Sequence, residues 1–583
     1  MCGIAGFVDK KGGFPRKGRE KIVGTMLKFM RHRGGDAVGV VSHDAITVGH
    51  TRLSILDNGL QANQPLVGSD SLLSFNGEIY NHTTLRNKYC KRRLASYSDT
   101  ATLFELLNIW PMAKVLNRIK GMYAFSHVDK KHSRLTLALD KFAIKPIYYV
   151  ETEDYFAWAS EAKAFKVLPG FSFQFDETCL KEYLIFRYVM GQRTLFKDVR
   201  KLCAGECLTL SLKNLSLKKR RYYELKGRLS TKKKFSESIL KSTLRAQLMS
   251  DIPVGIQLSG GLDSSLVALL AKGIMGGRPH TFSIGLEEES WNEFVYSDFI
   301  AEMLNTQHHK IVFSKSDYAR LFHAITYHLD EPLVHPNTIP MYILGKEARK
   351  YTKVLLTGEG ADEVFSGYNR YLKLKTYSNE EIYTSNAFSS EDDVSRILKD
   401  NKPIGSQRRS VLNSLRNIAS DKKTSLYDIQ TYLPHVLLRQ DKAGMAANIE
   451  NRVPFLYEPM VESSFGVTTR SKALGGKAPL KKIALKYFPK EFVMRKKCGF
   501  GLPIADWLKD KSALQPHLVS LKRSPFIKKY FIKKEINKLI KEHLTNVKDY
   551  SSLLFTLVAL LAWHDVFLNG RSMVTPPGAN RSL

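Results

Sequence analysis

Cysteine is scarce in this sequence, and its scarcity narrows the class of protein. The 583 residues contain six cysteines, too few in so long a chain to form a disulfide framework. The pair in CAGEC, Cys203 and Cys207, has a spacing close to that of metal ligands, but no second Cys or His pair follows at the distances typical of zinc sites. We therefore interpret these two cysteines as structural.

Long hydrophobic runs are also lacking. The most apolar late stretch, LLFTLVALLAW from Leu553 to Trp563, is too short to span a bilayer and predicts a buried helix. The opening MCGIAGFVDKKGG becomes charged too soon to contain the apolar core of a secretory signal. With the low cysteine content, these features lead us to expect a cytoplasmic protein with no membrane partner.

Acidic residues are few relative to basic ones. The sequence has 89 Lys and Arg against 56 Asp and Glu, a formal net charge of +33, and such an excess can indicate a nucleic-acid or membrane partner. Here the basic residues are mostly scattered, and the short runs Lys218–Arg221 and Lys232–Lys234 lie between periodic segments. We interpret these runs as solvated linker. Without the basic and aromatic pattern of single-strand binders, we do not expect nucleic acid as a partner.

The length predicts at least two domains, and two halves differ in pattern. Up to about Glu161, short strand-like segments separated by turns predict antiparallel sheets, with helical patterns around residues 20–30 and 100–109. From about Phe235, apolar runs alternate with longer helical stretches, which is typical of a parallel sheet covered by helices. The predicted fold is a layered α+β sandwich followed by an α/β domain.

The first glycine-rich turn of the second half lies in VGIQLSGGLDSS, residues 254–265. A buried strand leads into Ser259, Gly260 and Gly261, and Asp263 and Ser264 open an apolar helix. Two glycines let backbone N–H groups approach an anion, and the helix N-terminus adds partial positive charge. The motif lacks the GxxxxGK[ST] pattern of a Walker A loop. It predicts a pyrophosphate-binding loop that resembles the one in ATP pyrophosphatases.

The second turn follows another strand, in KVLLTGEGADEVFSGY, residues 353–368. Three carboxylates crowd it, those of Glu359, Asp362 and Glu363. Because acidic groups repel a triphosphate unless a cation lies between them, we expect Mg²⁺ to be bound by Asp263 and Asp362. The alternative for Glu359 is that it only caps a helix.

The ordered motifs of both halves together resemble those of glutamine-dependent asparagine synthetases. The first half contains MCGIAG, RHRGGDAVG, TRLSIL, FNGEIYN, SDT, GMYAF, IKPIYY and WASEAKA. The second contains DIPVGIQLSGGLDSS, TFSIG, LLTGEGADE, NRVPFL and RKKCGFGLPIADW. The resemblance implies an N-terminal-nucleophile antiparallel αββα sandwich, then a parallel-sheet ATP pyrophosphatase domain with a helical C-terminal part. We expect a class II glutamine amidotransferase domain at 2–190, a connector at 191–234, the synthetase domain at 235–540, and a helical C-terminal extension and tail at 541–583.

In the first half the resemblance makes Cys2 the nucleophile of a glutaminase. If Met1 is removed, the α-amine of Cys2 can accept the thiol proton, because the two groups have pKa values of about 7.7 to 8.0 and about 8.5. Asn76 and the N–H of Gly77 resemble an oxyanion hole. By spacing alone, Asp99 could instead be only a helix cap. The glutamine-binding residues implied are Arg52, Leu53, Ser54, Ile55, Leu56, Asn76, Gly77, Glu78 and Asp99.

In the second half the resemblance implies that aspartate and MgATP form β-aspartyl-AMP and pyrophosphate, and that ammonia then releases AMP and asparagine. Glu359 resembles the acidic residue that assists both steps, and Lys477 the lysine that stabilises phosphate charge, although Lys481 and Lys482 follow closely. An internal passage for ammonia is expected between the halves. The ATP-binding residues implied are Leu258, Ser259, Gly260, Gly261, Asp263, Ser264, Ile284, Thr357 and Gly358.

The sequence departs from the family pattern at a few positions. Gly35 stands where proline is usual, Leu139 and Ala143 where arginine and glycine are usual, Thr357 for serine and Tyr457 for aspartate. None of these removes a residue assigned to bond chemistry. The expected substrates are glutamine, aspartate and ATP, and whether the chain forms a homodimer stays open. Two alternatives also remain: a related amidotransferase with another carboxylate or amine acceptor, and an inactive basic binding protein.

Overall fold

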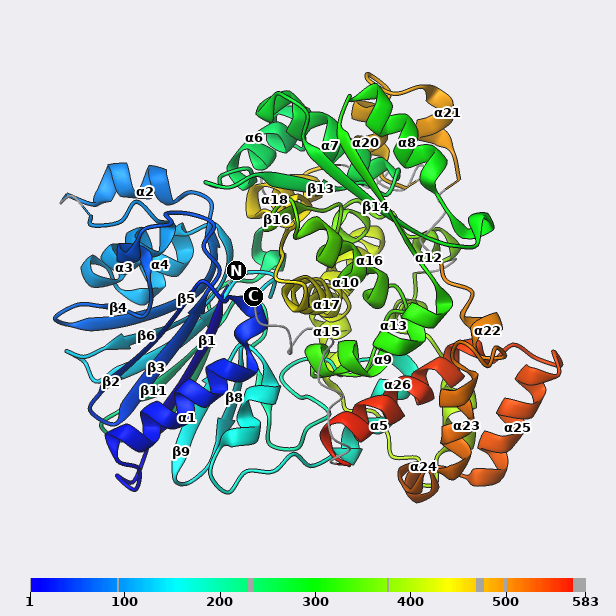
Figure 1. Ribbon diagram of the computed structural model, residues 1–583, viewed down its shortest axis with the longest axis horizontal. Helices are drawn as coiled ribbons and strands as arrows, with labels where there is room; N and C mark the ends of the chain where they lie inside the picture. The colour runs from blue at the N-terminus through cyan, green and yellow to red at the C-terminus, as the bar shows by residue number, and fades with distance from the viewer. Residues whose placement is uncertain are drawn as a thin grey trace.

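Two antiparallel sheets face each other in the first half of the protein (Figure 1). The computed structural model describes residues 2–91, 94–228, 234–374, 377–467, 476–496 and 501–569. Three stretches with predictions lie outside the described residues: 497–500 of the RKKCGFGLPIADW motif, 229–233, which contains most of the basic run Lys232–Lys234 predicted to be linker, and the expected tail at 570–583.

The first sheet has the strand order β10-β8-β9-β1-β3-β2, and the second β12-β11-β7-β6-β5-β4. The strands of the first sheet are β1 (Gly3–Asp9), β2 (Ala37–His43), β3 (Ile46–Arg52), β8 (Tyr148–Glu151), β9 (Tyr155–Ala159) and β10 (Arg200–Lys201). Those of the second are β4 (Leu66–Val67), β5 (Ser71–Ile79), β6 (Gly121–Asp129), β7 (Arg134–Leu139), β11 (Glu206–Ser211) and β12 (Leu217–Arg221).

The first half is a four-layered sandwich, because alternate side chains of each strand point to opposite faces of its sheet and helices cover the outer faces. In β1, Ile4 and Val8 belong to the core between the sheets, whereas Ala5 and Phe7 belong to the core under the outer helix, as a side-chain period of two requires. Helix α1 (Arg16–Phe29) packs on the first sheet, and α3 (Asp99–Ile109) packs on β5 of the second. Helices α2 (His82–Tyr89) and α4 (Met112–Arg118) accompany α3 (Figure 1). The predicted αββα sandwich is confirmed.

The segment expected as a connector contributes strands to this sandwich. Strand β10 pairs with β8, β11 pairs with β7, and β12 pairs with β11. The basic run at Lys218–Arg221, predicted to be solvated linker, is therefore an edge strand whose side chains are exposed. Lysine and arginine suit such a position because charge protects an exposed edge from further strand pairing.

The second half contains a five-stranded parallel sheet of order β15-β14-β13-β16-β17, as predicted. The order reverses at β13, so the carboxyl ends of β13 and β16 border a crevice of the kind that binds ligands in open α/β sheets. Helix α10 packs on β14 and β15, and α7 follows β13. The strands are β13 (Val254–Gln257), β14 (His280–Leu286), β15 (Gln307–Phe313), β16 (Val354–Leu356) and β17 (Glu450–Arg452).

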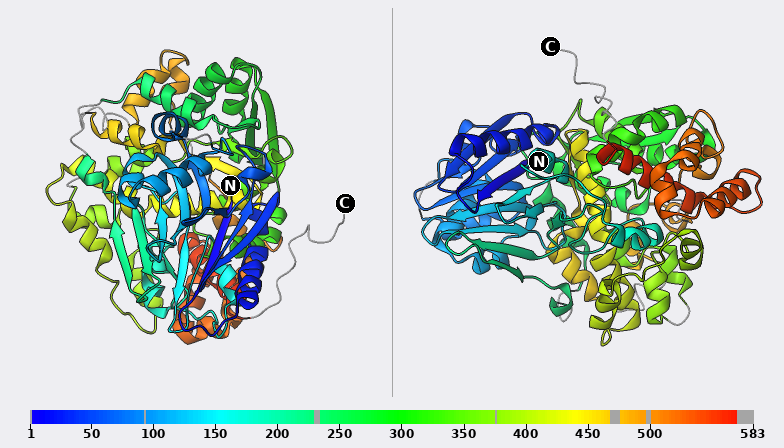
Figure 2. Two further views of the ribbon diagram at one scale, coloured as in Figure 1. Left: turned by 90° about the vertical axis from the view of Figure 1, so that its left-hand side faces the viewer. Right: turned by 90° about the horizontal axis from the view of Figure 1, so that it is seen from below.

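Helices make up the rest of the second half. The right-hand view of Figure 2 shows the two halves side by side from below, and in the left-hand view the first half faces the viewer. The first group comprises α6 (Glu237–Gln247), α7 (Leu262–Met275), α8 (Phe294–Met303), α9 (Lys315–Leu329), α10 (Thr338–Ala348), α11 (Ala361–Phe365), α12 (Asn369–Lys373), α13 (Asn379–Thr384), α14 (Glu391–Ile397), α15 (Gln407–Ser414), α16 (Ser420–Thr431) and α17 (Leu433–Ala446). The second comprises α18 (Glu458–Phe465), α20 (Ala478–Ala484), α21 (Lys490–Met494), α22 (Ile504–Trp507), α23 (Gln515–Arg523), α24 (Pro525–Tyr530), α25 (Lys533–Leu544) and α26 (Ser551–Phe567).

Short 3₁₀ turns occur in both halves of the protein. They are η1 (Arg31–Arg33), η2 (Leu60–Ala62), η3 (Ala162–Val167), η4 (Glu177–Cys179), η5 (Leu225–Arg228), η6 (Glu289–Trp291) and η7 (Pro454–Leu456).

Helix α26 is the buried late helix that the sequence predicts. Its residues 553–563 are buried, and it packs against α9, α23 and α5 (Leu180–Phe186). Helix α5 thus joins the helices of the second half, although it precedes the expected boundary at residue 190. Among the described residues, none of the helices has the length and apolar character needed to cross a membrane.

Candidate active sites

The first candidate site is built around Cys2, which directly precedes β1 and is buried. Its backbone N–H donates to Oδ1 of Asn76 on β5 at 3.0 Å, so the contact joins the two sheets. Burial raises the pKa of the Cys2 thiol, while the Leu53 backbone and Arg52 act in the opposite direction. A thiol in this setting needs a base nearby to become a nucleophile.

Asn76 and Gly77 are placed to donate hydrogen bonds beside this thiol. Asn76 is fully buried, and its Nδ2 has no hydrogen-bond partner among the described residues. Burying an amide N–H without a hydrogen-bond acceptor costs free energy, unless a bound ligand accepts the hydrogen bond. Gly77 has φ of +155° and approaches the next strand so closely that a Cβ would lie 2.0 Å from the Met122 carbonyl oxygen. Only glycine fits there.

A small pocket of about 30 Å³ opens beside Cys2 and collects most of the glutamine-binding residues predicted from the sequence. Arg52 is held by the loop after β3: its guanidinium donates to the Gly59 carbonyl at 3.1 Å and to Asn63 Oδ1 at 2.7 Å. No carboxylate within the described part of the chain pairs with it. Ser54 does not line the pocket, and its N–H donates to Asp36 instead. The predicted residues in the lining are Cys2, Arg52, Leu53, Ile55, Leu56, Gly77, Glu78 and Asp99.

Two buried carboxylates, Glu78 and Asp99, face the same pocket. Burial and the nearby charge of Asp99 raise the pKa of Glu78 well above its ordinary value. Burial raises the pKa of Asp99 to about 6, against hydrogen bonds from the N–H groups of Ile79 and Thr100. The helix cap of α3 is Ser98, which accepts from the Ala101 N–H. Asp99 is therefore not the cap residue.

The second half contributes to this pocket, which the sequence did not predict. Glu450 of β17 lines it, and Arg452 lies 3.3 Å from Glu78 and 2.7 Å from Glu450. Burial opposes ionisation of Glu450, but the charges of Arg452 and Lys145 and the hydrogen bond from Arg452 act against burial, and the pKa of Glu450 lies below its ordinary value. The NRVPFL motif covers Arg452, yet nothing in the sequence connects residues 450–452 with residue 2.

The second candidate site lies where β13 and β16 end. Gly260 follows β13 with φ of +71°, and a Cβ on it would lie 2.6 Å from the backbone nitrogen of Ser297. Gly261 precedes the first residue of α7, and the hydroxyls of Ser259 and Ser264 lie 3.0 Å apart across the turn. Backbone N–H groups at this helix start can bind an anion. The predicted phosphate-binding loop is present as a strand, turn and helix.

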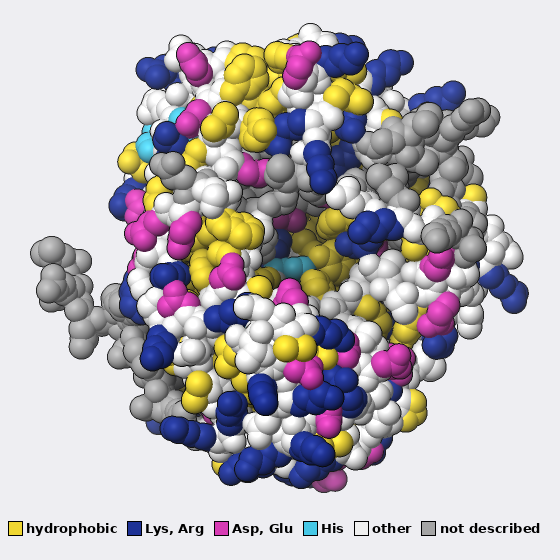
Figure 3. Space-filling model, turned by 90° about the vertical axis from the view of Figure 1, so that its right-hand side faces the viewer, with side chains coloured by type: hydrophobic (Ala, Val, Ile, Leu, Met, Phe, Trp, Pro, Cys, Tyr) yellow, Lys and Arg dark blue, Asp and Glu magenta, His cyan; other side chains and the backbone are white. Residues whose placement is uncertain are grey.

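Neighbouring strands complete the surroundings of this loop. Gly358, after β16, lies against the first turn of α7, where a Cβ on it would be 3.2 Å from the backbone nitrogen of Ser264. Leu258 is fully buried, and Ile284 is half-buried on β14. Thr357 donates its hydroxyl to the Arg452 carbonyl at 3.2 Å. The face of the molecule drawn in Figure 3, which belongs to the second half, is hollowed at its centre and lined by hydrophobic side chains.

Lys477 connects the two carboxylates that the sequence assigned to a metal. Its Nζ contacts Asp263, and it lies 2.8 Å from Asp362. Burial acts against the charged ammonium, but Asp263 and Asp362 outweigh it and raise the pKa of Lys477 above its ordinary value. Lys482, on α20, is exposed. The geometry therefore favours Lys477 over the lysines that follow it.

Glu359 is paired rather than used as a helix cap. Gly360 is the N-cap of α11, without a side-chain cap, and Glu359 accepts a hydrogen bond from Nη2 of Arg439 at 3.1 Å. Arg439 lies on α17 and also donates to Asn337 at 2.7 Å. No pattern in the sequence indicates Arg439, because only the fold brings α17 to the loop after β16.

Two family models match the chain. The family model for asparagine synthase matches residues 236–565, and that for a glutamine amidotransferase domain matches residues 1–223. The chain is 29% identical to asparagine synthetase [glutamine-hydrolyzing] 1 of Bacillus subtilis, over 98% of each chain. It is 28% identical to a putative asparagine synthetase [glutamine-hydrolyzing] of Mycobacterium tuberculosis H37Rv over 97% of each. It is 26% identical to asparagine synthetase B [glutamine-hydrolyzing] of Escherichia coli K12, over 88% of this chain and 85% of that one. The chain belongs to the asparagine synthase family.

Proposed function

We propose that this protein is a glutamine-hydrolysing asparagine synthetase. It would amidate L-aspartate with ammonia from glutamine and convert ATP to AMP and pyrophosphate. The observation that carries the proposal is the pocket beside Cys2, which combines a buried thiol, the guanidinium of Arg52 and the carboxylates of Glu78, Asp99 and Glu450. A guanidinium suits the α-carboxylate of glutamine, and carboxylates suit its α-ammonium.

The first reaction is glutamine hydrolysis by Cys2. Removal of Met1 would leave the α-amine of Cys2 as the base that takes the thiol proton. The thiolate then attacks the amide carbon, and ammonia leaves as the thioester forms. Nδ2 of Asn76 and the N–H of Gly77 would stabilise the oxyanion, at about 2.7 to 4 kcal/mol per donor. The lack of any partner for Asn76 Nδ2 within the described part of the chain supports this assignment.

Arg52, Glu78 and Asp99 would orient glutamine for this attack. Arg52 is fixed by loop oxygens and is not neutralised by a carboxylate of the described residues, so its charge is available to the α-carboxylate. Leu53, Ile55 and Leu56 would enclose the substrate beside it. Ser54 would contribute only through its backbone, because its N–H already donates to Asp36.

The second reaction takes place where β13 and β16 end. The turn of Ser259, Gly260 and Gly261 would bind the phosphates of ATP through N–H groups, and Leu258, Ile284, Thr357 and Gly358 would surround the nucleoside. A carboxylate oxygen of aspartate attacks the α-phosphate, pyrophosphate leaves, and ammonia then displaces AMP. Glu359 would accept a proton from the attacking ammonia, and Lys477 would stabilise charge on the phosphate.

Asp263 and Asp362 fit a magnesium site. Both approach the same ammonium group of Lys477, so their oxygens can reach one cation, and carboxylate oxygens are the ligands that Mg²⁺ prefers. The described residues contain no cluster of three or more metal-binding side chains, which agrees with a metal that takes its other ligands from phosphate and water. When bound, Mg²⁺ would offset the charge of the triphosphate beside these two carboxylates.

One segment touches both sites. Arg439 of α17 binds Glu359, and Glu450 of β17 lines the pocket of Cys2. Ammonia released into water at neutral pH would be protonated and lost as a nucleophile, so transfer inside the protein is expected. Residues 433–452 are the segment along which we propose that it passes from one half to the other.

The deciding experiment measures pyrophosphate released from the purified protein with MgATP and glutamine, with and without aspartate. The amidated product is identified by mass. Release that depends on aspartate and yields asparagine would support the proposal. Release with another acceptor would move the protein to a related amidotransferase activity, and no turnover with salt-dependent nucleic-acid binding would favour a binding protein.

A further inference from the structure

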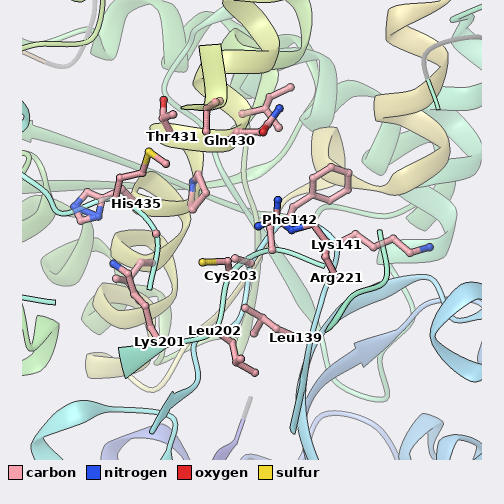
Figure 4. A pocket seen from close by; sticks show the side chains of 18 of the residues that line it. Leu139, Lys141, Phe142, Lys201, Leu202, Cys203, Arg221, Gln430, Thr431 and His435 are labelled. Atoms are coloured by element: carbon pink, nitrogen blue, oxygen red, sulfur yellow. The ribbon is translucent and has the colours of Figure 1, made fainter. Parts of the chain in front are cut away.

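A cavity of about 430 Å³ lies between the two halves, and its lining shares no residue with the pocket of Cys2 or with the ATP-binding loops. Its volume is in the range of ordinary small-molecule sites. In Figure 4, Gln430, Thr431 and His435 come from the helices of the second half, whereas Lys201, Leu202 and Cys203 come from the opposite side. The exposed residues Glu224 and Lys226 are part of the lining, so the cavity opens to solvent.

The lining is apolar and aromatic, with an excess of positive charge. Four rings face the cavity, and five basic side chains line it against one acidic residue, Glu224. Which of these basic groups can attract an anion depends on the carboxylates that pair with them. The rings are those of Phe142, Tyr148, Tyr188 and Tyr223, and the basic side chains are those of Lys141, Lys145, Lys201, Arg221 and Lys226.

The carboxylates that balance four of these basic groups stand outside the lining. Lys141 pairs with Glu458 at 2.5 Å and Lys145 with Asp441 at 3.3 Å. Lys201 and Arg221 likewise pair with glutamates behind the wall. Lys226 differs, because its ammonium donates to the Ser414 carbonyl and has no carboxylate within ion-pair distance in the described part of the chain.

His435 adds a polar group without a partner. It is 5% exposed, stacks on Tyr188, and its Nε2 makes no hydrogen bond to any described residue. Its Nδ1 lies 3.6 Å from Glu331. Buried polar atoms are nearly always hydrogen-bonded. Because this nitrogen is itself closed to solvent, it makes the wall polar without offering a direct contact to a ligand.

Two lining positions are also departures from the family pattern. Leu139 stands where arginine is usual, and Ala143 where glycine is usual, and both line the cavity. Leucine is shorter than arginine and leaves apolar space. Ala143 keeps a left-handed backbone, with φ of 57°, which costs a non-glycine residue about 1 to 2 kcal/mol. The cavity is therefore shaped in part by two residues that depart from the usual family pattern.

We propose that this interdomain cavity binds an aromatic organic anion: a ring system that fills the apolar walls and one acidic group that pairs with Lys226. The inference goes beyond synthesis of asparagine, since none of the residues proposed to bind glutamine, ATP or metal lines the cavity, although Pro434, His435 and Leu438 belong to the segment proposed for ammonia transfer. Because the walls come from both halves, the ligand binds most tightly to one arrangement of the halves and favours that arrangement.

The test uses the full-length protein and 8-anilinonaphthalene-1-sulfonate, a fluorescent aromatic anion, in a fluorescence titration. We expect one saturable site per chain. Ala204→Trp, which fills the cavity from the turn before β11, and Lys226→Glu, which reverses the unpaired charge, should each weaken binding by at least about tenfold. Lys213→Glu is the matched control, since it makes the same charge change at an exposed turn outside the lining and should leave binding unchanged.

A second probe separates charge from hydrophobicity. The neutral N-phenyl-1-naphthylamine has the same ring system without the sulfonate, and we expect it to bind at least about tenfold more weakly. Equal binding of the two probes would overturn the anion preference. Sulfonate binding unaffected by Lys226→Glu, or affected equally by Lys213→Glu, would overturn the site itself. Lys226 is exposed, so its variant tests the proposal even if Ala204→Trp does not fold. None of these readings depends on asparagine synthesis.

Discussion

Arg452 and Glu78 form an ion pair across the boundary between the two halves. Nη2 of Arg452, on β17, lies 3.3 Å from Oε1 of Glu78, on β5, and both residues are buried. The same guanidinium binds Glu450 at 2.7 Å. This guanidinium favours the ionised form of both glutamates, against the burial and the Asp99 charge that raise the pKa of Glu78. Because Glu450 and Arg452 come from the synthetase half, the pocket is complete only when both halves are docked.

Replacing Arg452 with methionine should damage both stability and glutamine use. Two buried carboxylates would lose their counter-charge, and loss of one partner of a buried pair costs about 3 to 5 kcal/mol. We expect a lower thermal unfolding midpoint and a higher KM for glutamine. Arg193→Met is the control, because the Arg193–Asp176 pair at 3.0 Å is partly exposed and contributes about 0 to 1 kcal/mol. Equal effects of the two variants would contradict the assignment.

Replacing Cys2 with alanine should abolish synthesis from glutamine and spare synthesis from ammonium salts. The change removes the nucleophile, whereas the site at the ends of β13 and β16 keeps all its residues. Asparagine formed from each nitrogen source measures the two activities separately. Cys90→Ala, at a half-buried cysteine outside both sites, should retain both. If Cys2→Ala lost both activities, the scheme with two separate sites would be wrong.

Replacing Asn76 with aspartate tests the oxyanion hole. Aspartate keeps an oxygen that can accept from the Cys2 N–H, as Asn76 Oδ1 does at 3.0 Å, but it loses the Nδ2 donor and adds negative charge. Glutaminase kcat should fall by about 10² to 10³, the usual cost of one oxyanion donor, while KM changes less. Steady-state hydrolysis of glutamine measures both constants. An unchanged kcat would remove Asn76 from the oxyanion hole.

Sequence patterns predicted the layers of the fold because hydrophobic periodicity is local. The alternation of Ile4 and Val8 with Ala5 and Phe7 can be read along one strand. Pairing at the sheet edges could not be read in this way. The basic run at residues 218–221 has the composition of a linker, and only its hydrogen bonds to β11 make it a strand.

The residues of the two sites also differ in whether the sequence could predict them. Cys2, Gly77 and Lys477 lie in motifs whose chemistry can be inferred from neighbouring residues. Arg439 and Glu450 act at sites whose other members lie tens to hundreds of positions away, and long-range packing brings them there. No periodicity or spacing in the sequence encodes such a contact, so these residues came only from the structure.

Glutamine binding should weaken in acid because of Asp99. Burial raises its pKa to about 6, above the value of about 3.9 for a free aspartate, so the folded state holds this proton more tightly than the unfolded state. Protonated Asp99 therefore stabilises the folded protein at low pH, and this contribution is lost as the pH rises through about 6. Binding of the substrate ammonium needs the ionised form, so KM for glutamine should rise below about pH 6. KM measured across this range tests the assignment, and Asp99→Asn should raise KM and flatten the profile. Synthesis from ammonium salts also falls in acid, because less unprotonated ammonia is present, but Asp99→Asn should leave that dependence unchanged.

Replacing Lys477 with methionine should abolish synthesis of asparagine and spare glutamine hydrolysis. Lys477 is the buried cation between Asp263 and Asp362, so its loss leaves the two carboxylates without their balancing charge and removes stabilisation of the phosphate. We expect a fall of at least about 10²-fold in pyrophosphate release, measured with saturating aspartate and ammonium. Lys482→Met is the matched control, since this lysine is exposed five residues later on α20 and should change the rate little. If Lys482→Met were the more damaging of the two, the phosphate-stabilising role would belong to the later lysine and the geometry around Asp263 would have another purpose.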